Sequence, residues 1–315
     1  MTARIFIDGE AGTTGLQIRA RLDARTDLSL LSLPVAHRKD PQARADLLNQ
    51  ADLVILCLPD EAAREAVSLI TRPEVRVIDA STAHRVAPGW VYGFPEIEQN
   101  HASRIARATR VANPGCYPTG AIALLRPLIA AGLLPADLPF TINAVSGYSG
   151  GGKALIQRYE DPSAPDPLDL PFWLYSLGLE HKHVAELELH GGLARRPLFL
   201  PSVGRFAQGM LVQIPLQLWA LPGQTRIADL HAVLFDWYRD QPFVKVAALD
   251  HCRQLERLGP EGLNGTNEMH LFCFGNEAHQ QIVLTALLDN LGKGASGAAV
   301  QNLNLMLGLS SDLGL

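Results

Sequence analysis

One cysteine of this 315-residue chain stands where a thiol could act as a nucleophile. Cys116 lies in the segment ANPGCYPTG, in which Asn-Pro-Gly predicts a turn and Pro118 suits the first turn of a following helix. Free N–H groups and the positive end of a helix dipole lower the pKa of such a thiol and can stabilise an oxyanion. The alternative is a small buried cysteine in a turn, which is the role that Cys57, Cys252 and Cys273 fit.

A glycine run near the N-terminus offers a second kind of chemistry. Gly9, Gly12 and Gly15 lie between the strand-like segment ARIFID and the helix-like segment LQIRARLDAR. Glycines permit a tight turn and a close backbone approach to a pyrophosphate, which the helix N-terminus attracts. Thr13 and Thr14 add hydroxyl donors. At the start of a predicted βαβ unit, this pattern favours a dinucleotide site over a plain glycine-rich turn.

The residues after the second predicted strand, residues 28–34, bear on which dinucleotide binds. Sites that prefer NAD usually carry Asp or Glu there, about 20 residues after the glycines. This chain has no acid at that position, and Arg38 and Lys39 follow shortly after. A guanidinium can hold a 2′-phosphate through two parallel hydrogen bonds. The sequence therefore favours NADP with Arg38 as a ligand, the alternative being a solvated basic turn.

The elements that position these residues follow from the hydrophobic pattern. Apolar runs typical of buried strands alternate with helical segments through the first part of the chain. This alternation predicts an α/β fold with a Rossmann-like, doubly wound parallel sheet. The predicted strands are residues 3–8, 28–34, 52–59, 75–80 and 110–113, and the predicted helices are residues 16–25, 43–50, 61–70 and 121–134.

The regular alternation of strands and helices ends after the helix that follows Cys116. Longer strands separated by Gly and Pro turns include residues 198–206 and 209–219, and residues 269–291 look like paired strands with a turn at Gly275–Asn276. They predict a second α+β domain with a large mixed or mostly antiparallel sheet that helps the protein to dimerise. The last segment, GASGAAVQNLNLMLGL, is predicted to be helical. We expect an NADP-binding domain of residues 1–117 plus 296–315, and a substrate-binding and dimerisation domain of residues 118–295.

Composition excludes several classes of protein. The chain is 47% hydrophobic and 19% charged, with a net charge of −5 and no cluster of basic residues of the kind that binds nucleic acid. It shows no signal peptide and no apolar run near the ~20 residues of a membrane span. Its four widely spaced cysteines fit reduced thiols, and it contains no CxxC or HExxH motif. We expect a cytoplasmic protein without a metal site.

Several segments, found in order along essentially the whole chain, carry a resemblance to a known family. The strongest are the loop 9–15, DASTAHR at 79–85, NPGCYPTG at 113–120 and GASGAAVQNLNLM at 294–306, with support from YGFPE, SGYSGGGK and HKHVAEL. Together they resemble the N-acetyl-γ-glutamyl-phosphate reductases of the shorter variety, within the aspartate-semialdehyde dehydrogenase superfamily. NPGCYPTG is the most specific of these segments.

The resemblance implies an activity and two catalytic residues. The family uses NADPH to reduce N-acetyl-γ-glutamyl phosphate to N-acetyl-glutamate semialdehyde in arginine biosynthesis, through a cysteine thioester, and this role falls on Cys116. The family's histidine lies in an H-x-H-x-P-E stretch, which here runs from His181 to Glu186 with Ala185 in place of proline. We choose His183 as the general acid/base, with Glu186 as its orienting partner and His181 as the alternative.

Other residues receive roles around substrate and cofactor. Arg85 follows a strand at the carboxyl end of the predicted sheet, where it could hold the leaving phosphate, and Arg205 could pair with a substrate carboxylate. Gly147, in SGYSGGGK, is expected to bring backbone close to substrate. Ser81 and Asn302 are expected on the cofactor side, Asn302 facing the nicotinamide. The alternatives are solvated arginines, a glycine-rich hairpin and a packing asparagine.

Two competing interpretations remain. An aspartate-semialdehyde dehydrogenase, or another acyl-phosphate reductase, would share this fold and chemistry, but the former carries an arginine a few residues before a Gly-His pair, which this chain lacks. A non-enzymatic NADP-binding sensor would be expected to lose Cys116 or the histidine pair, and both are present. The expected partners are the small-molecule substrate, inorganic phosphate and further copies of the chain in a homodimer or homotetramer.

Overall fold

The computed structural model describes residues 2–38 and 40–315, so that Lys39 lies outside the described residues. The chain forms two compact units, divided between Gly115 and Cys116 and again between Gly294 and Ala295. The first unit therefore combines the N-terminal segment with the C-terminal one. The predicted boundaries put Cys116 in the first unit and Ala295 in the second. In the structure Cys116 belongs to the second unit and Ala295 to the first.

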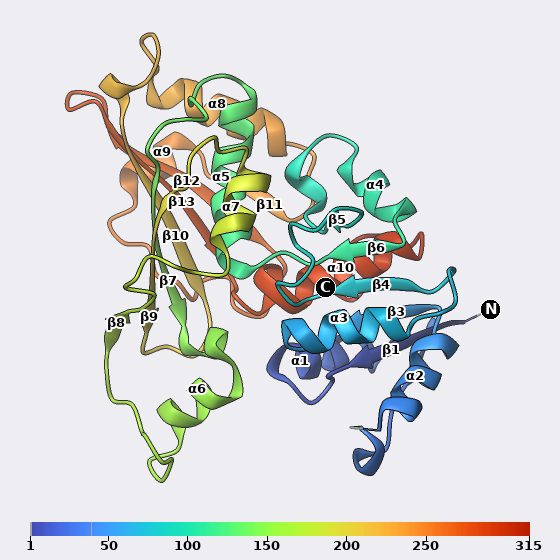
Figure 1. The fold of residues 1–315 in the computed structure, drawn as a ribbon. Helices are drawn as coiled ribbons and strands as arrows, with labels where there is room; N and C mark the ends of the chain where they lie inside the picture. Colours follow the sequence, from blue (N-terminus) through green and yellow to red (C-terminus); the bar gives the residue numbers. More distant parts are fainter. Residues whose placement is uncertain (1, 39) are drawn as a thin grey trace. The chain divides into compact units, whose positions relative to one another are not determined.

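The first unit is built on a six-stranded sheet in which every neighbouring pair is parallel (Figure 1). The strand order is β2-β1-β3-β4-β6-β5. The strands are continuous apolar runs because helices cover both faces, and all four residues of β3 are buried. The strands are β1 (Ala3–Asp8), β2 (Leu28–Leu31), β3 (Leu53–Leu56), β4 (Arg76–Asp79), β5 (Val91–Tyr92) and β6 (Arg110–Ala112).

Successive strand residues face opposite helical layers. On one face Ile5 and Ile55 pack with residues of α1 (Thr13–Leu22), α4 (His101–Arg107) and the C-terminal helix α10 (Gly297–Met306). On the other face Phe6 and Val54 pack with residues of α2 (Pro41–Gln50) and α3 (Asp60–Leu69). The predicted doubly wound α/β class is confirmed.

Strand β1 pairs with both β2 and β3, so the chain leaves it in one direction and later returns on its other side. Ligands of doubly wound folds bind outside the carboxyl ends of the strands at such a point. The loop that follows β1 contains the glycine run, and α1 begins at Thr13 rather than at the predicted residue 16. Both threonines of the loop therefore lie in the first turn of the helix.

The second unit is built on a seven-stranded sheet of order β11-β12-β13-β10-β7-β9-β8. The pairs β11–β12 and β7–β9 are parallel and the other neighbours are antiparallel, which confirms the predicted mixed sheet. The strands are β7 (Thr141–Gly147), β8 (Phe172–Leu174), β9 (Leu198–Gly204), β10 (Met210–Gln217), β11 (Val244–Val246), β12 (Met269–Asn276) and β13 (Gln281–Leu288).

The predicted turn at Gly275–Asn276 is wrong. Both residues belong to β12, where they pair with Ile282 and Gln281, and the turn lies at residues 277–280. Gln280 takes the left-handed conformation there, with φ of 51°. The ladder therefore includes the Gly-Asn dipeptide and ends at the Asn276–Gln281 pair.

Helix α5 (Cys116–Ala130) is the central helix of the second unit and is buried for most of its length. A Cβ on Gly120 would lie 2.9 Å from a Val212 methyl group and 3.3 Å from the Ala286 Cβ, so the helix lies directly on β10 and β13. Pro127 cannot donate to the Ala123 carbonyl, which accepts a 2.9 Å hydrogen bond from the Tyr238 hydroxyl instead. These contacts fix a helix whose first residue is Cys116.

The other helices of the second unit are α6 (Gly152–Glu160), α7 (Val184–Gly191), α8 (Ile227–Tyr238) and α9 (Leu249–Gln254). Short 3-10 segments are η1 (Val35–His37), η2 (Pro95–Ile97), η3 (Tyr148–Gly151) and η4 (Leu218–Ala220), and η5 (Gly292–Ser296) is π-helical. Within the described ranges, none of the helices has both the length and the apolar character needed to cross a bilayer.

Candidate active site

The glycine loop after β1 is packed against backbone. A Cβ on Gly9 would lie 2.3 Å from the Cys57 carbonyl oxygen, and Gly9 has φ of +89°, so a side chain there meets both a clash and strain. A Cβ on Gly15 would lie 2.5 Å from the Gly9 carbonyl oxygen. That oxygen also accepts a 3.0 Å hydrogen bond from the Gly12 N–H, which closes the turn. At Gly12 the nearest atom to a Cβ would be 3.4 Å away, so Gly12 is the least constrained of the three.

The N-terminus of α1 fits an anionic ligand. Gly12 is the N-cap and supplies no side-chain cap, and the first turn contains no acidic residue. The Thr13 Oγ1 atom is buried, and no hydrogen-bond partner reaches it from the part of the chain that the structure describes. Thr14 lies beside it in the same first turn. Uncapped N–H groups and an orphaned buried hydroxyl are what a pyrophosphate would satisfy.

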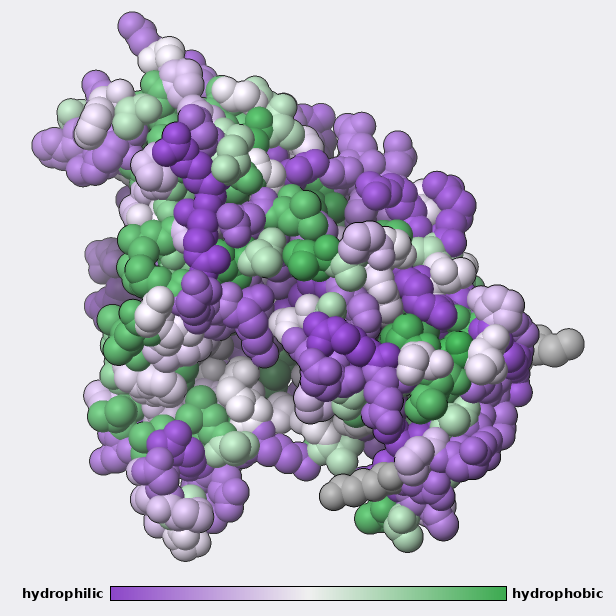
Figure 2. Space-filling model, viewed as in Figure 1, coloured by the Kyte–Doolittle hydropathy of each residue, from purple (hydrophilic) through white to green (hydrophobic). Residues whose placement is uncertain are grey.

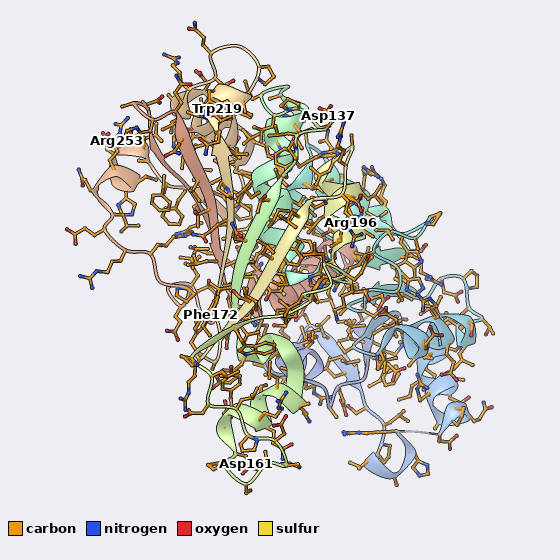
Figure 3. All side chains as sticks on the ribbon, turned by 60° about the vertical axis from the view of Figure 1, so that its left-hand side comes forward. Asp137, Asp161, Phe172, Arg196, Trp219 and Arg253 are labelled. Carbon is orange, nitrogen blue, oxygen red and sulfur yellow. The ribbon has the colours of Figure 1, made fainter. Side chains whose placement is uncertain are left out.

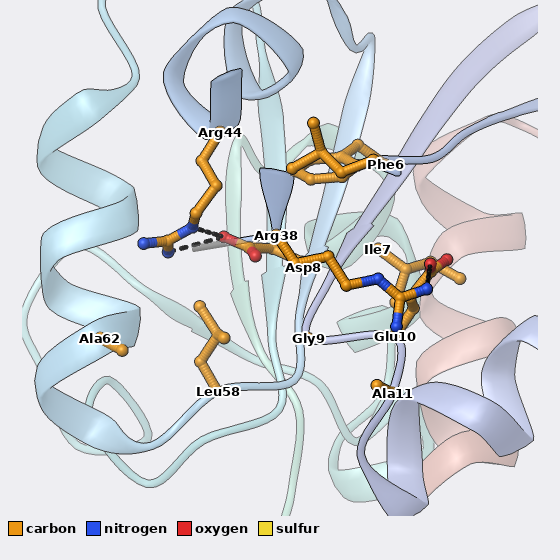
Figure 4. Close-up of a pocket in the computed structure, with 11 residues that line it drawn as sticks. Phe6, Ile7, Asp8, Gly9, Glu10, Ala11, Arg38, Arg44, Leu58 and Ala62 are labelled. Carbon is orange, nitrogen blue, oxygen red and sulfur yellow. Dashed lines mark hydrogen bonds and ion pairs between the residues drawn. The ribbon is translucent and has the colours of Figure 1, made fainter. Parts of the chain in front are cut away.

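A cavity of about 320 Å³ lies at the carboxyl end of β1 (Figure 4). Arg38 lines it and donates to the Glu10 carboxylate at 2.6 Å, and Arg44 pairs with Asp8 at 2.9 Å. Arg38 is the predicted 2′-phosphate ligand, and the Glu10 carboxylate that faces it is not indicated by the sequence. The remaining lining residues are Phe6, Ile7, Gly9, Ala11, Leu33, Leu58 and Ala62.

The DASTAHR segment forms a hydrogen-bonded loop at the carboxyl end of β4. Asp79, which is fully buried, accepts from the Ser81 N–H at 2.9 Å and from its hydroxyl at 2.7 Å. The His84 Nδ1 atom lies 2.6 Å from the same carboxylate, and the His84 ring stacks on Trp90. Arg85 is buried and donates from Nε to the Asn113 carbonyl at 2.9 Å. Ser81 and Arg85 thus contribute hydrogen bonds that hold the loop itself.

Asn302 lies fully buried in α10. Its Nδ2 atom donates to the Gly93 carbonyl at 2.9 Å and to the Asn113 Oδ1 atom at 3.0 Å. Its Oδ1 atom is buried and accepts no hydrogen bond from the residues described. A carboxamide N–H, such as that of a nicotinamide, would satisfy this acceptor.

In the second unit Cys116 is half-buried, as the first residue of α5. Two tyrosines accompany it. The Tyr117 hydroxyl donates to the Ser202 carbonyl at 3.2 Å, and the Tyr175 hydroxyl donates to the Tyr117 hydroxyl at 3.1 Å. Burial raises the pKa of both phenols, and a negative charge on Cys116 raises it further. Both phenols therefore stay protonated beside the thiol.

The two histidines of HKHVAEL lie together in the same unit, with ring centroids 4.7 Å apart. The His183 N–H donates to the His181 Nδ1 atom at 3.1 Å, and the His181 Nε2 atom lies 3.4 Å from the Tyr175 hydroxyl. With Nδ1 as acceptor, neutral His181 carries its proton on Nε2, the atom that faces Tyr175. His183 is 6% exposed, directly before α7, and Glu186 is buried in the first turn of that helix.

The remaining predicted residues have structural contacts of their own. A Cβ on Gly147 would lie 2.6 Å from the Ala207 carbonyl oxygen, and the Gly147 N–H donates to the Gly209 carbonyl at 2.9 Å. This glycine therefore permits a close approach between two backbone segments. Arg205 is half exposed and pairs with Asp169.

The cluster of Cys116, Tyr117, Tyr175 and the two histidines is thus only partly the one predicted. Tyr117 directly follows Cys116 in NPGCYPTG, so the sequence itself places a phenol next to the thiol. Tyr175 lies 58 residues from Tyr117 in the chain, and no motif marks it.

Comparisons with known proteins agree with this architecture. Residues 34–105 match the family model of the semialdehyde dehydrogenase NAD binding domain, and residues 116–290 match that of the semialdehyde dehydrogenase dimerisation domain. A solved structure of aspartate semialdehyde dehydrogenase II complexed with ASA, from Vibrio cholerae, superposes with a TM-score of 0.72 at 15% identity, covering 98% of this chain and 99% of that one. Aspartate semialdehyde dehydrogenase with NADP from Candida albicans gives 0.65 at 13% identity, covering 98% and 99%. The fold and the two matched models define a protein of the semialdehyde dehydrogenase class.

Sequence relatives narrow the class. N-acetyl-gamma-glutamyl-phosphate reductase 2 of Pseudomonas putida is 58% identical over 307 residues, which cover 98% of this chain and 97% of the relative. N-acetyl-gamma-glutamyl-phosphate reductase of Brucella ovis is 59% identical over 309 residues, covering 98% and 100%. The chain belongs to the N-acetyl-γ-glutamyl-phosphate reductase family, and the predicted family is confirmed.

Proposed function

We propose that this protein reduces N-acetyl-γ-glutamyl phosphate to N-acetyl-glutamate semialdehyde with NADPH, a step of arginine biosynthesis. The observation that carries the proposal is Cys116, the first residue of a buried helix, in a chain that is 58–59% identical to named reductases of this substrate. The residues on the cofactor side fit a dinucleotide. Gly9, Gly15 and Thr13 would hold the pyrophosphate, Arg38 the 2′-phosphate and Asn302 the nicotinamide carboxamide.

In the proposed mechanism the Cys116 thiolate attacks the carbonyl carbon of the acyl phosphate. A C–S bond forms, and inorganic phosphate leaves with the electron pair of the broken C–O bond. The positive end of the α5 dipole, at its N-terminus, would stabilise the oxyanion that forms on the carbonyl oxygen. The chemistry that NADPH supplies when bound is the hydride for the thioester carbon. Collapse of the thiohemiacetal then breaks the C–S bond, returns the electron pair to sulfur and releases the aldehyde.

Proton exchange at the thiohemiacetal oxygen requires one of the two histidines. The choice of His183 from the sequence stays a prediction, but two observations support His181. His181 is only half-buried, whereas His183 is 6% exposed. The His181 Nε2 atom also faces Tyr175, whose hydroxyl bonds to the neighbour of Cys116. We therefore propose that His181 exchanges the proton through Nε2 and that His183 and Glu186 position the ring.

The substrate contacts remain proposals. Arg85 would bind the phosphoryl group, supported by its place after β4 at the carboxyl end of the sheet. Arg205 would bind the substrate carboxylate, supported by its half-exposed guanidinium, which holds the carboxylate of Asp169 in this structure. Ser81 would act on the cofactor side and Gly147 on the substrate side through the loops that they hold in shape.

The assay that tests the proposal runs the reaction in reverse. Purified protein with N-acetylglutamate semialdehyde, NADP and phosphate should produce NADPH, and aspartate semialdehyde under the same conditions should not. The reverse preference would assign the aspartate enzyme's activity instead. If neither aldehyde reacts while NADP still binds, the protein is a sensor and the proposal fails.

A second copy of the chain is the proposed protein partner. The second unit matches a dimerisation domain, and Figure 2 shows apolar side chains over the β8–β9 side of that unit. Phe172, Leu174 and Leu198 are 55%, 51% and 43% exposed, and their pairing places them on one face of the sheet with the exposed Gln213. Figure 3 shows Phe172 at the edge of that sheet. This face is the proposed interface of a homodimer or homotetramer, because exposed apolar patches mark association surfaces.

The proposed location is the cytoplasm. All four cysteines are free thiols, as expected in a reducing compartment.

A further inference from the structure

A carboxylate from the glycine loop holds two guanidinium groups at the carboxyl ends of β1 and β2. The Arg38 Nη2 atom lies 2.6 Å from Glu10 Oε1, and the Arg19 Nη1 atom lies 3.3 Å from Glu10 Oε2. Arg19 Nη1 also donates to the Ser32 hydroxyl at 2.5 Å. The Glu10 side chain is only 17% exposed, so it forms the inner member of this cluster. Figure 4 shows the Glu10–Arg38 pair at the edge of the cavity.

The cluster has the composition of an anion-binding site in which the Glu10 carboxylate takes the place of the bound anion. Two guanidinium groups and a hydroxyl surround one carboxylate, which is the donor set that recognises a phosphate. Ser32 directly follows β2, where an NAD-binding chain would carry an acid, so the acid here comes from the loop after β1 instead.

Arg44, which lines the cavity with Arg38, does not share this role. Arg44 is 11% exposed and pairs with Asp8 at 2.9 Å and with Glu65 at 3.8 Å. Arg19 also has a second acid, Asp23, which lies 2.6 Å from its Nε atom one helical turn away. That contact leaves Nη1 directed at Glu10 and Ser32, so Arg19 can present it to another anion in the same place.

We propose, building on the NADPH-dependent function above, that Arg19, Arg38 and Ser32 together form the 2′-phosphate site and that Glu10 is an internal competitor for it. The Glu10 carboxylate occupies both guanidinium groups and repels a second anion, so it lowers the affinity for 2′-phosphorylated nucleotides. A ribose without the 2′-phosphate can donate its hydroxyl to the same carboxylate. Glu10 therefore narrows the preference of the protein for NADPH over NADH.

The test measures binding rather than turnover. Isothermal titration calorimetry of the full chain with 2′,5′-ADP and with 5′-AMP isolates the 2′-phosphate, since both probes carry a single 5′-phosphate and neither carries nicotinamide. Glu10→Gln should tighten binding of 2′,5′-ADP about 5- to 10-fold, because near-surface charge pairs contribute about 1 kcal/mol. It should not tighten binding of 5′-AMP, which has no 2′-phosphate for Glu10 to repel. Arg19→Gln and Arg38→Gln should each weaken binding of 2′,5′-ADP about 10-fold and leave the affinity for 5′-AMP within about 2-fold of the wild type. These differences should shrink at high salt.

The matched control is Glu74→Gln. Glu74 pairs with Arg72 at 2.7 Å just before β4, at the opposite end of the sheet, so this variant should bind both probes like the wild type. If Arg19→Gln does not fold, Arg19→Lys keeps the charge and removes the guanidinium geometry, and it should still weaken 2′,5′-ADP.

The outcomes separate this inference from the function on which it rests. If the wild type binds the two probes equally, the NADPH proposal itself fails. If the wild type prefers 2′,5′-ADP but Glu10→Gln binds it no more tightly, the competitor role of Glu10 is refuted while NADPH stands. If Arg19→Gln weakens both probes equally, Arg19 is not part of the 2′-phosphate site.

Discussion

Limited alkylation at about pH 8 should separate Cys116 from the three other cysteines, since burial raises the pKa of each of those thiols. For Cys57, at the end of β3, burial and the nearby charges of Asp79 and Asp8 raise the pKa to about 12. For Cys273, inside β12, burial raises it to about 12 as well. At pH 8 such a thiol is about 10⁻⁴ ionised, whereas an ordinary thiol of pKa about 8.5 is about one quarter ionised.

The ratio of thiolate fractions is therefore more than about 10³, but it overstates the difference in rate. The logarithm of the thiolate's rate constant rises by about 0.4–0.5 for each unit of pKa. The higher pKa of Cys57 and Cys273 therefore makes each of their thiolates about 10^1.5-fold more reactive, which offsets part of the difference in ionisation. An ordinary thiol should thus react about 50-fold faster than Cys57 or Cys273. Cys116 is only half-buried and is the first residue of α5, where the helix dipole favours a thiolate. We therefore expect Cys116 to react at least as fast as an ordinary thiol.

The assay combines iodoacetamide labelling, peptide mass spectrometry and residual activity on the same samples. Loss of activity should follow modification of Cys116 one for one, and Cys116→Ser should keep nucleotide binding and lose turnover. Raising the pH towards about 12 should narrow the labelling difference as Cys57 and Cys273 ionise. Labelling of Cys57 at the rate of Cys116, or inactivation with Cys116 unmodified, would refute the reasoning.

Three further changes test the cofactor loop, the proton donor and the interface. Gly15→Ala should abolish NADP binding in a calorimetric titration, because its Cβ would lie 2.5 Å from the Gly9 carbonyl oxygen. His181→Asn should lower kcat by about 10²- to 10⁴-fold, the usual range for a lost general acid/base, and should remove a limb of the pH–rate profile. Leu174→Glu should shift the molar mass measured by light scattering towards the monomer, because it places a charge on the proposed interface.

Each of these changes has a matched control. Gly12→Ala should retain most NADP binding, because the nearest atom to its Cβ, the Gly9 carbonyl oxygen, would be 3.4 Å away. His183→Asn should lower the melting temperature and change kcat much less than His181→Asn does. A larger loss of kcat in His183→Asn than in His181→Asn would instead support His183, the residue chosen from the sequence. Leu189→Glu, at an exposed position on α7, should leave the molar mass unchanged, and equal dissociation by both leucine variants would contradict the proposed face.

Features that depend on local pattern were accessible from the sequence. The strands of the first sheet are apolar runs, and the glycine spacing indicates the loop between β1 and α1 because it lies between a strand-like and a helix-like segment. Helix α1 begins at Thr13, three residues before the predicted start at Leu16, because Thr13 and Thr14 have weak helix propensity and are not among the buried residues of the helix.

Features that depend on distant pairing were not accessible. Glu10 and Arg38 are 28 residues apart, and Tyr117 and Tyr175 are 58 apart, so nothing in either neighbourhood indicates the contact. Gly275 and Asn276 favour a turn locally, whereas in the structure both residues pair within the β12–β13 ladder and the turn follows them at residues 277–280. In each case tertiary packing decides between conformations that the local sequence leaves open.

The position of Cys116 depends on the core rather than on a surface loop. Helix α5 is apolar on most of its circumference and is buried against β10 and β13, so its N-terminus cannot shift without disturbing the sheet. The Tyr238 hydroxyl satisfies the carbonyl that Pro127 leaves without a donor, which keeps the middle of the helix intact. The thiol and the helix N-terminus, which we propose stabilises the oxyanion, are therefore fixed before substrate binds. Groups fixed in this way need no rearrangement as charge develops, which is the condition under which electrostatic stabilisation is most effective.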